Sequence, residues 1–137
     1  MKMRINFRLF AMLLVFTLVL VGCATVEKDT AMDTERLLSA SGFQMRLADT
    51  PQKLDKIKTM TQRKLIRHQR NGIIDYIYVD ATDCKCLYAG TEKAYKKFKN
   101  LSAIRLSGDE ATARDENVKI DWKIWGGDPG STWQYWE

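Results

Sequence analysis

The chain has 137 residues, of which 45% are hydrophobic and 28% are charged, as expected for one small globular domain plus any targeting segment. This length excludes a Rossmann enzyme and a TIM barrel. The 22 Lys and Arg against 17 Asp and Glu give a net charge of +5, but without Lys2, Arg4 and Arg8 it is only 19 − 17 = +2. That balance excludes a strongly basic nucleic-acid-binding protein, so we expect no nucleic-acid partner.

The first 22 residues have the pattern of a secretory signal peptide. A basic segment ends at Arg8, and residues 9–21 (LFAMLLVFTLVLV) form an apolar run of 13 residues. A membrane-spanning helix needs about 20 apolar residues, so the run is short for that role. We therefore expect residues 1–22 to be removed after export, and the alternative is an uncleaved membrane helix followed by a chance cysteine.

The residues that end this run are Leu20, Val21, Gly22 and Cys23, and they resemble the lipobox of bacterial lipoproteins. The resemblance implies cleavage by signal peptidase II between Gly22 and Cys23. It also implies a diacylglyceryl group on the Cys23 sulfur and an acyl chain on its new amino group, with no other cofactor. Two or three acyl chains, at about 0.8 kcal/mol per buried CH₂, make a stable membrane anchor.

Position 24, directly after the lipobox cysteine, is Ala24. In Gram-negative cells this residue resembles that of lipoproteins released to the outer membrane, which predicts a periplasm-facing protein there. The mature chain would have 137 − 22 = 115 residues. We divide it into a lipidated tether (23–33), a small domain (34–125) and a Trp-rich C-terminal tail (126–137).

The first predicted elements of the domain are a helix over residues 34–40 and a strand near 43–48. Asp33 or Thr34 is the predicted N-cap, and Gly42 suits the left-handed position that ends a helix. Phe43 then packs back on the helix, and apolar and polar residues alternate after it. Thr50-Pro51 predicts the start of a second short helix, whose apolar stripe is Leu54, Ile57 and Met60.

The strongest local signal is a β-hairpin over residues 64–79. Two runs rich in β-branched and aromatic residues are joined by Asn71-Gly72, which favours a type I′ turn. With Arg70 opposite Ile73, the numbers of opposed residues sum to 143. The predicted pairs are then Ile66–Ile77, Arg67–Tyr76, His68–Asp75 and Leu65–Tyr78.

A third strand near 84–89 and an edge strand near 118–124 complete the predicted sheet. Between them, Gly90-Thr91 opens a helix with one apolar side (Ala94, Tyr95, Phe98 and Leu101). The fold class is therefore α+β: a small antiparallel sheet with two or three short helices packed on one face.

Cys84 and Cys86 are the residues that most suggest chemistry, because the envelope outside the inner membrane is oxidising. Residues i and i+2 of a strand lie on one face, so the two thiols can form a disulfide. The hypotheses are a structural disulfide or buried thiols, an easily reduced redox disulfide, and a site for a soft ion such as Cu(I). Candidate extra ligands, by residue type alone, are His68, Met45 and Met60.

His68 is the single histidine, and its predicted partner Asp75 could orient the ring. A hydrolase using this pair needs a nucleophile, and the chain has no Gly-x-Ser-x-Gly motif. Most such pairs on hairpins are surface contacts worth a fraction of a kcal/mol. We rank the hydrolase third, after a non-enzymatic module and a redox or metal-handling protein.

Basic residues gather in two stretches. Residues 46–70 contain eight basic and two acidic residues, and residues 85–104 contain five and one. These stretches could face anionic lipid or an acidic envelope protein, although solvated surface is the simpler interpretation. Four tryptophans follow at the C-terminus: Trp122 is expected to complete the core, and Trp133 and Trp136 either do so or form a recognition surface, while Trp125 is left open.

The mature part also resembles small lipoproteins of proteobacterial envelopes whose activity has not been assigned. This resemblance implies no catalytic residue. The residues that carry it are Gly42-Phe43, Ala48-Asp49-Thr50-Pro51, Asn71-Gly72, Tyr76-x-Tyr78-x-Asp80 and Cys84-x-Cys86-Leu87-Tyr88-x-Gly90.

Overall fold

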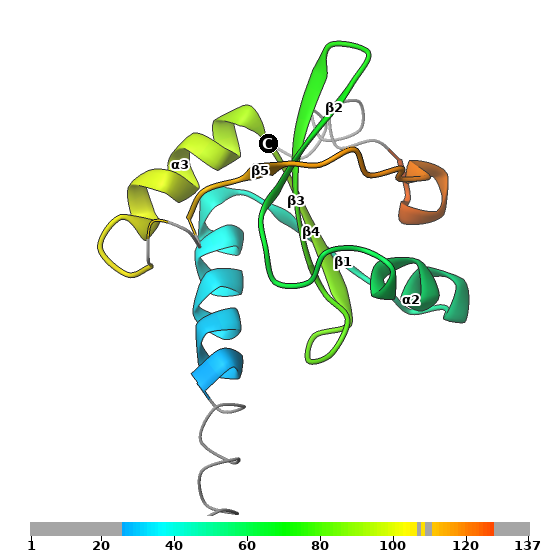
Figure 1. The fold of residues 1–137 in the computed structure, drawn as a ribbon, viewed down its shortest axis with the longest axis horizontal. Coiled ribbons are helices and arrows are strands. Elements are labelled where there is room, and N and C mark those ends of the chain that lie inside the picture. The colour runs from blue at the N-terminus through cyan, green and yellow to red at the C-terminus, as the bar shows by residue number, and fades with distance from the viewer. Residues whose placement is uncertain (1–25, 107, 109–110, 128–137) are drawn as a thin grey trace, which may run out of the picture. The chain divides into compact units, whose positions relative to one another are not determined.

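The computed structural model describes residues 26–106, 108 and 111–127 (Figure 1). The lipobox with Cys23 and the last two tryptophans, Trp133 and Trp136, lie outside the described residues. The chain divides into two compact units, Met1–Asp33 and Thr34–Glu137. Among the described residues, the helices are too short or too polar to span a bilayer.

The N-terminal helix begins earlier than expected. Residues 26–33 of the first unit and 34–41 of the second are all helical, so the predicted start near residue 34 is wrong. The prediction required an apolar stripe, but residues such as Glu27 and Lys28 favour helix without one. The predicted helix end is confirmed: Gly42 has φ 95°, and the Phe43 N–H donates to the Leu38 carbonyl at 3.0 Å.

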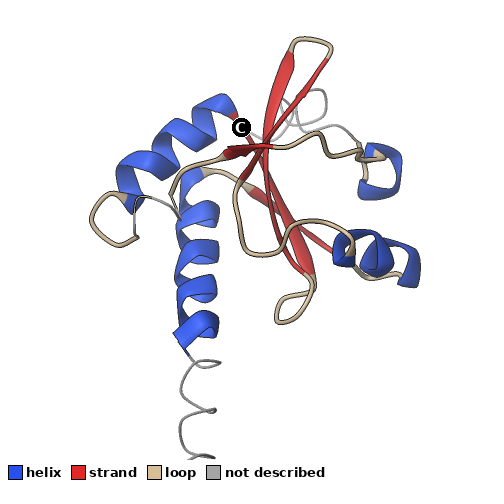
Figure 2. Cartoon of the chain, viewed as in Figure 1, coloured by secondary structure: helices blue, strands red, loops and turns tan. Residues whose placement is uncertain are grey.

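Five strands form one sheet in the order β1-β4-β3-β2-β5 (Figure 2). Among the first four strands in this order, each pair of neighbours is antiparallel. The α+β fold class is therefore confirmed. Their bounds are β1 (Gln44–Leu47), β2 (Ile66–Arg70), β3 (Ile73–Asp80), β4 (Cys86–Thr91) and β5 (Arg114–Asp115).

The β2–β3 hairpin has the predicted register. His68 lies opposite Asp75 and Ile66 opposite Ile77. Asn71 and Gly72 have φ of 51° and 82°, the two positive values that a type I′ turn requires.

The sheet has two faces because successive residues of a strand point to opposite sides. The aromatic face packs against residues 34–41 and helix α3 (Glu92–Ser102); its buried strand residues include Tyr76, Tyr78 and Tyr88. The aliphatic face packs against helix α2 (Pro51–Lys58) and the 3₁₀ helix η1 (Trp122–Trp125); its buried strand residues include Ile77, Val79, Leu87 and Ala89.

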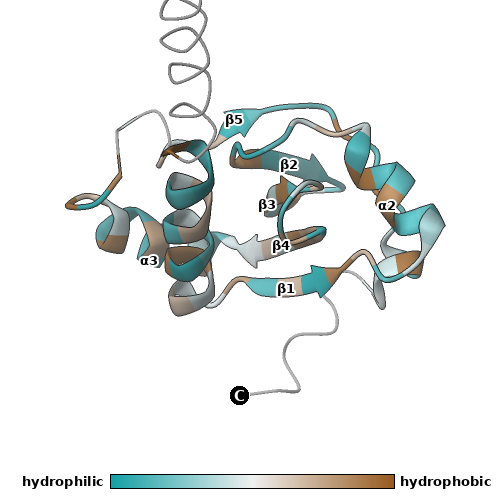
Figure 3. Cartoon of the chain, turned by 90° about the horizontal axis from the view of Figure 1, so that it is seen from below, coloured by the Kyte–Doolittle hydropathy of each residue, from teal (hydrophilic) through white to brown (hydrophobic). Residues whose placement is uncertain are grey.

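Helices therefore cover both faces, and the prediction that they pack on one face is wrong. Seen from below, the strands lie between α3 on one side and α2 on the other (Figure 3). The apolar stripe of α2 packs on the aliphatic face and that of α3 on the aromatic face. The pattern within each helix does not specify which face of the sheet it will cover. Within the α3 stripe, Leu101 is 40% exposed rather than buried, and Ser102 beside it is the fully buried residue of the last turn.

The predicted edge strand near 118–124 is also wrong. The segment that joins the sheet is β5, which pairs parallel to β2 with Ile66 opposite Arg114. Val118 and Ile120 pack on the aliphatic face from an irregular segment, and residues 122–125 form η1. Alternating apolar residues can thus dock on a sheet without joining it.

Candidate functional site

Cys84 and Cys86 form a disulfide, with their Cα atoms 5.2 Å apart. Contrary to prediction, the two residues do not lie in one strand: Cys84 belongs to the turn after β3, and β4 begins at Cys86. Lys85 between them has φ 50°, a left-handed conformation, and folds the backbone back so that the two side chains meet. Cys84 is half-buried, whereas Cys86 is fully buried.

Asp80 holds the turn that carries Cys84. Its carboxylate is fully buried and accepts hydrogen bonds from the backbone N–H groups of Thr82 and Asp83, both at 2.8 Å. The Arg63 guanidinium donates to the other Asp80 oxygen at 2.8 Å and also contacts the Asp83 carboxylate. Three donor groups are thereby fixed around one buried carboxylate, and the turn is well defined.

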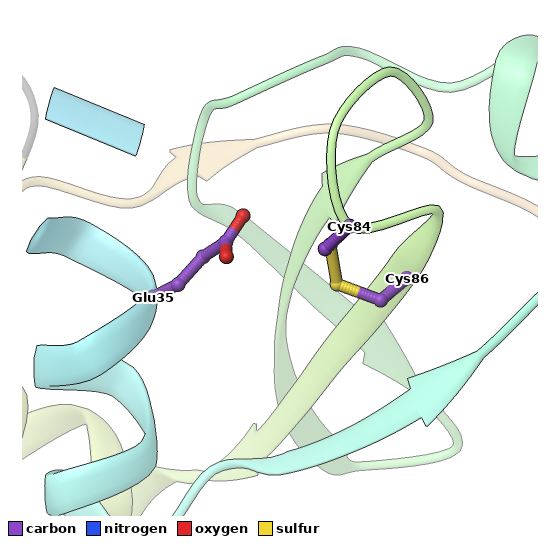
Figure 4. A group of neighbouring side chains, drawn as sticks. All are labelled: Glu35, Cys84 and Cys86. Atoms are coloured by element: carbon purple, nitrogen blue, oxygen red, sulfur yellow. A yellow bond between two sulfur atoms is a disulfide. The ribbon is translucent and has the colours of Figure 1, made fainter. Parts of the chain in front are cut away.

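The third member of the cluster is Glu35, which comes from the N-terminal helix (Figure 4). A Glu35 carboxylate oxygen and the Sγ atoms of Cys84 and Cys86 all lie within 4.8 Å of one another. Sequence reasoning missed this residue. The signal was its spacing of three from Leu38, which is fully buried, since that spacing places both on the inner side of the helix.

The charges near the disulfide shift several pKa values. Burial raises the pKa of Glu35, and the Asp80 and Asp83 carboxylates raise it further, against a smaller opposing effect of Arg63. Burial also raises the pKa of Tyr78, which keeps its phenol neutral. Burial alone would raise the pKa of Asp80, but its hydrogen bonds from Asp83, Arg63 and Thr82 outweigh burial and lower it.

This arrangement is suited to thiol–disulfide chemistry. It offers a disulfide of which one cysteine is only half-buried, and a carboxyl group whose pKa is raised above the usual value for glutamate. A metal ion would need the two thiolates that the disulfide now joins. Of the extra ligands proposed by residue type, Met60 lies on the aliphatic face and Met45 lies opposite Tyr88 at the edge strand, 48% exposed.

His68 and Asp75 form a separate cluster. The predicted pairing is confirmed, but the expectation of a surface contact is wrong: His68 is 6% and Asp75 1% exposed. The expectation assumed one open face, whereas both faces of the sheet are covered. Thr91 lies opposite Asp75 on β4, but its hydroxyl caps α3 by accepting from the Ala94 N–H at 3.4 Å.

A polar surface pocket of about 240 Å³ lies between the end of α2 and the segment before η1. Thr61 donates to Glu116 across it at 2.8 Å, which occupies the carboxylate. The pocket contains neither cysteine nor histidine; it is lined by Lys56, Thr59, Met60, Thr61, Glu116, Asn117, Val118 and Lys119.

The two tryptophans of η1 are both buried. Trp122 is 5% exposed, as predicted for core completion, and Trp125 is 3% exposed with Lys53 5.6 Å from its ring centroid. The candidate groups therefore lie apart from the tryptophans: the cluster around Cys84–Cys86 is on the aromatic face, and the buried His68–Asp75 pair joins β2 and β3. No protein-family model, curated protein or solved structure matches the chain.

Proposed function

We propose that this protein is a bacterial envelope lipoprotein anchored through Cys23, whose domain is a non-enzymatic binding or structural module. The observation that carries the proposal is the order of the N-terminal sequence: basic residues, an apolar run, then Leu20-Val21-Gly22-Cys23. Ala24 favours the outer membrane of a Gram-negative cell. Acyl chains on Cys23 supply the membrane contact, so the domain itself is left to meet another envelope component.

The test is the intact mass of the protein purified from native membranes. We expect an N-terminus at Cys23 that carries added lipid mass, and Cys23→Ser should abolish lipid incorporation and leave the precursor uncleaved. The matched control is the double variant Cys84→Ser/Cys86→Ser, which should keep the lipid. A wild-type protein without lipid, or a lipidated Cys23→Ser variant, would contradict the anchor.

The exposed lysines of α3 favour a binding partner that carries negative charge. These lysines are Lys93, Lys96, Lys97 and Lys99. Charge at such a surface attracts anionic lipid headgroups or acidic protein within about 10 Å at ordinary ionic strength. Replacing all four lysines by Gln should weaken binding to vesicles of anionic lipid and not to neutral ones. Equal binding to both vesicle types would favour an acidic protein instead.

A second candidate function is redox or metal handling by Cys84 and Cys86. The observation that favours the redox form is the disulfide, with Cys84 only half-buried and the Glu35 carboxyl group beside it. Under this function, Cys84→Ser/Cys86→Ser abolishes a thiol-dependent activity. Under the first function, the same variant keeps both fold and partner binding.

A further inference from the structure

The two cysteines of the disulfide differ in burial. Cys84 lies half-buried in the turn, whereas Cys86 lies fully buried at the start of β4. Cys84 is thus the more exposed residue of the pair, and we take its sulfur as the one that an incoming thiolate attacks. Because thiol–disulfide exchange expels the other sulfur, Cys86 becomes the leaving group.

The place where Cys86 departs is unfavourable for a negative charge. Cys86 is opposite Asp80 on β3, whose pKa is lowered and whose carboxylate is ionised, and opposite Leu47 on β1. A buried thiolate has lost its hydration and here also faces a like charge in its neighbourhood. The leaving sulfur thus needs a proton as the S–S bond breaks.

Glu35 is placed to supply that proton. Its carboxylate oxygen lies within 4.8 Å of both sulfurs, and the side chain points from the N-terminal helix toward the disulfide (Figure 4). Breaking the S–S bond frees the Cys86 side chain to rotate, which allows a hydrogen bond to this oxygen. Glu35 is itself half-buried, so proton exchange with water remains open.

We propose that Glu35 is the proton donor for thiol–disulfide exchange at Cys84–Cys86, with a dithiol as the substrate class. This inference rests on the redox function proposed above. A substrate thiolate attacks the Cys84 Sγ atom, and the electron pair of the S–S bond passes to the Cys86 Sγ atom, which takes the Glu35 proton. The products are a mixed disulfide at Cys84, a Cys86 thiol and a Glu35 carboxylate.

The second substrate thiol, as its thiolate, then attacks the substrate sulfur of the mixed disulfide. Cys84 leaves as a thiolate and takes a proton from water. The substrate dithiol has been oxidised to a disulfide, and the protein disulfide has been reduced to two thiols, so electrons balance. In the reverse direction, the Glu35 carboxylate takes the Cys86 proton.

The groups that surround Glu35 agree with this role. They are Asp80 and Asp83 with their counter-ion Arg63, and the phenols of Tyr78 and Tyr88. Arg63 is the cation among them, and its guanidinium is engaged by both aspartates. Burial and the two aspartates therefore keep Glu35 protonated to a higher pH than an ordinary glutamate, as a proton donor requires.

The experiment measures the rate at which dithiothreitol reduces the disulfide in the full mature protein. The rate is divided by the thiolate concentration and followed from about pH 4 to about pH 8, across the range in which carboxyl groups titrate. The wild type should lose rate as pH rises through the pKa of Glu35. Glu35→Gln should remove this inflection and be slower by about 100-fold at the acidic end, the lower end of the usual general-acid effect.

Two variants complete the comparison. Glu27→Gln changes an exposed glutamate of the same helix and should keep the wild-type profile. Glu35→Asp retains an acid and should restore an inflection, and it serves if Glu35→Gln fails to fold. An unchanged profile in Glu35→Gln overturns the proton-donor role alone. A wild-type disulfide that resists dithiothreitol at every pH removes the redox function together with it.

Discussion

The two faces of the sheet are built from neighbouring residues of the same strands, yet their chemistry differs. On the aromatic face, Tyr78 and Tyr88 pack edge to face with ring centroids 6.3 Å apart. On the aliphatic face, Val79 and Leu87 lie one residue along and bury only hydrocarbon. The carboxylate of Asp80 is buried beside the aromatic face because the backbone N–H groups of Thr82 and Asp83 and the Arg63 guanidinium donate to it. The difference teaches that the donors of a turn, and not the packing of a whole face, decide where this sheet can bury the Asp80 carboxylate.

The first way to break this comparison is to remove one anchor from each face. Phe98→Ala in α3 should cost about 3–5 kcal/mol and Ile57→Ala in α2 about 2–5 kcal/mol, because each side chain is fully buried and leaves a cavity. Urea denaturation measures both. If the faces are independent, the costs add within about 0.5 kcal/mol in the double variant, and strong coupling would show that the layers act as one core.

The second prediction concerns acid stability of the aromatic face. The folded-state pKa of Asp80 is lowered, so its stabilisation is present above the ordinary aspartate pKa of about 3.9 and is lost as pH falls through the lower folded value. Asp80→Asn should cost about 1–3 kcal/mol at neutral pH, since Arg63 loses its fully buried charged partner and keeps only Asp83. The urea midpoint of Asp80→Asn should then change less between neutral and acidic pH than that of the wild type. An equal change in both proteins would mean that groups other than Asp80 cause the loss of stability in acid.

A third prediction tests the close packing of Phe43, which follows the N-terminal helix, against Gly90 of β4. A Cβ atom on Gly90 would come within 2.6–2.8 Å of ring carbons of Phe43 on the aromatic face. Gly90→Ala should therefore destabilise by about 1–3 kcal/mol through overpacking. Adding Phe43→Leu should recover part of this loss in thermal unfolding. A double variant less stable than the sum of both would disprove the steric cause.

The smallest expected effect is the coupling between His68 and Asp75, the polar pair at the other end of β3. A double-mutant cycle with alanine at each position should give an interaction energy of about 0.5–3 kcal/mol, because both side chains are buried and opposed. The interaction energy is obtained from the free energies of unfolding of the wild type, the two single variants and the double variant, measured by chemical denaturation. A coupling near zero would show that each of the two buried side chains is stabilised by other groups rather than by its cross-strand partner.

Local signals in the sequence predicted local structure well. Asn71-Gly72 specifies the turn, and one pairing, Arg70 with Ile73, determines the whole register because strand partners shift together. Gly42 and Thr50 likewise mark a helix end and a helix start. Long-range placement failed instead: the α2 stripe does not say which face it covers, and the alternation near Ile120 does not say whether backbone pairing occurs.

The candidate site was predicted in part for the same reason. The disulfide follows from two cysteines two residues apart, and it forms through the left-handed Lys85 rather than through a strand. Glu35 lies 49 residues before Cys84, so only the packing of the helix on the aromatic face brings it there. The metal ligands suggested by residue type were not gathered, because residue type carries no information on distance.

The parallel pairing of β5 with β2 has a consequence for folding order. Arg67 and Asp115 are 48 residues apart, whereas the β2–β3 hairpin closes through a two-residue turn. Closing a long loop costs more entropy, so we expect the hairpin to form early and β5 to add late. Until then β2 presents an open edge, to which a strand of another chain can add. β5 covers this edge at Ile66 and Arg67, so the step that completes the sheet also shortens the edge at which another chain can add.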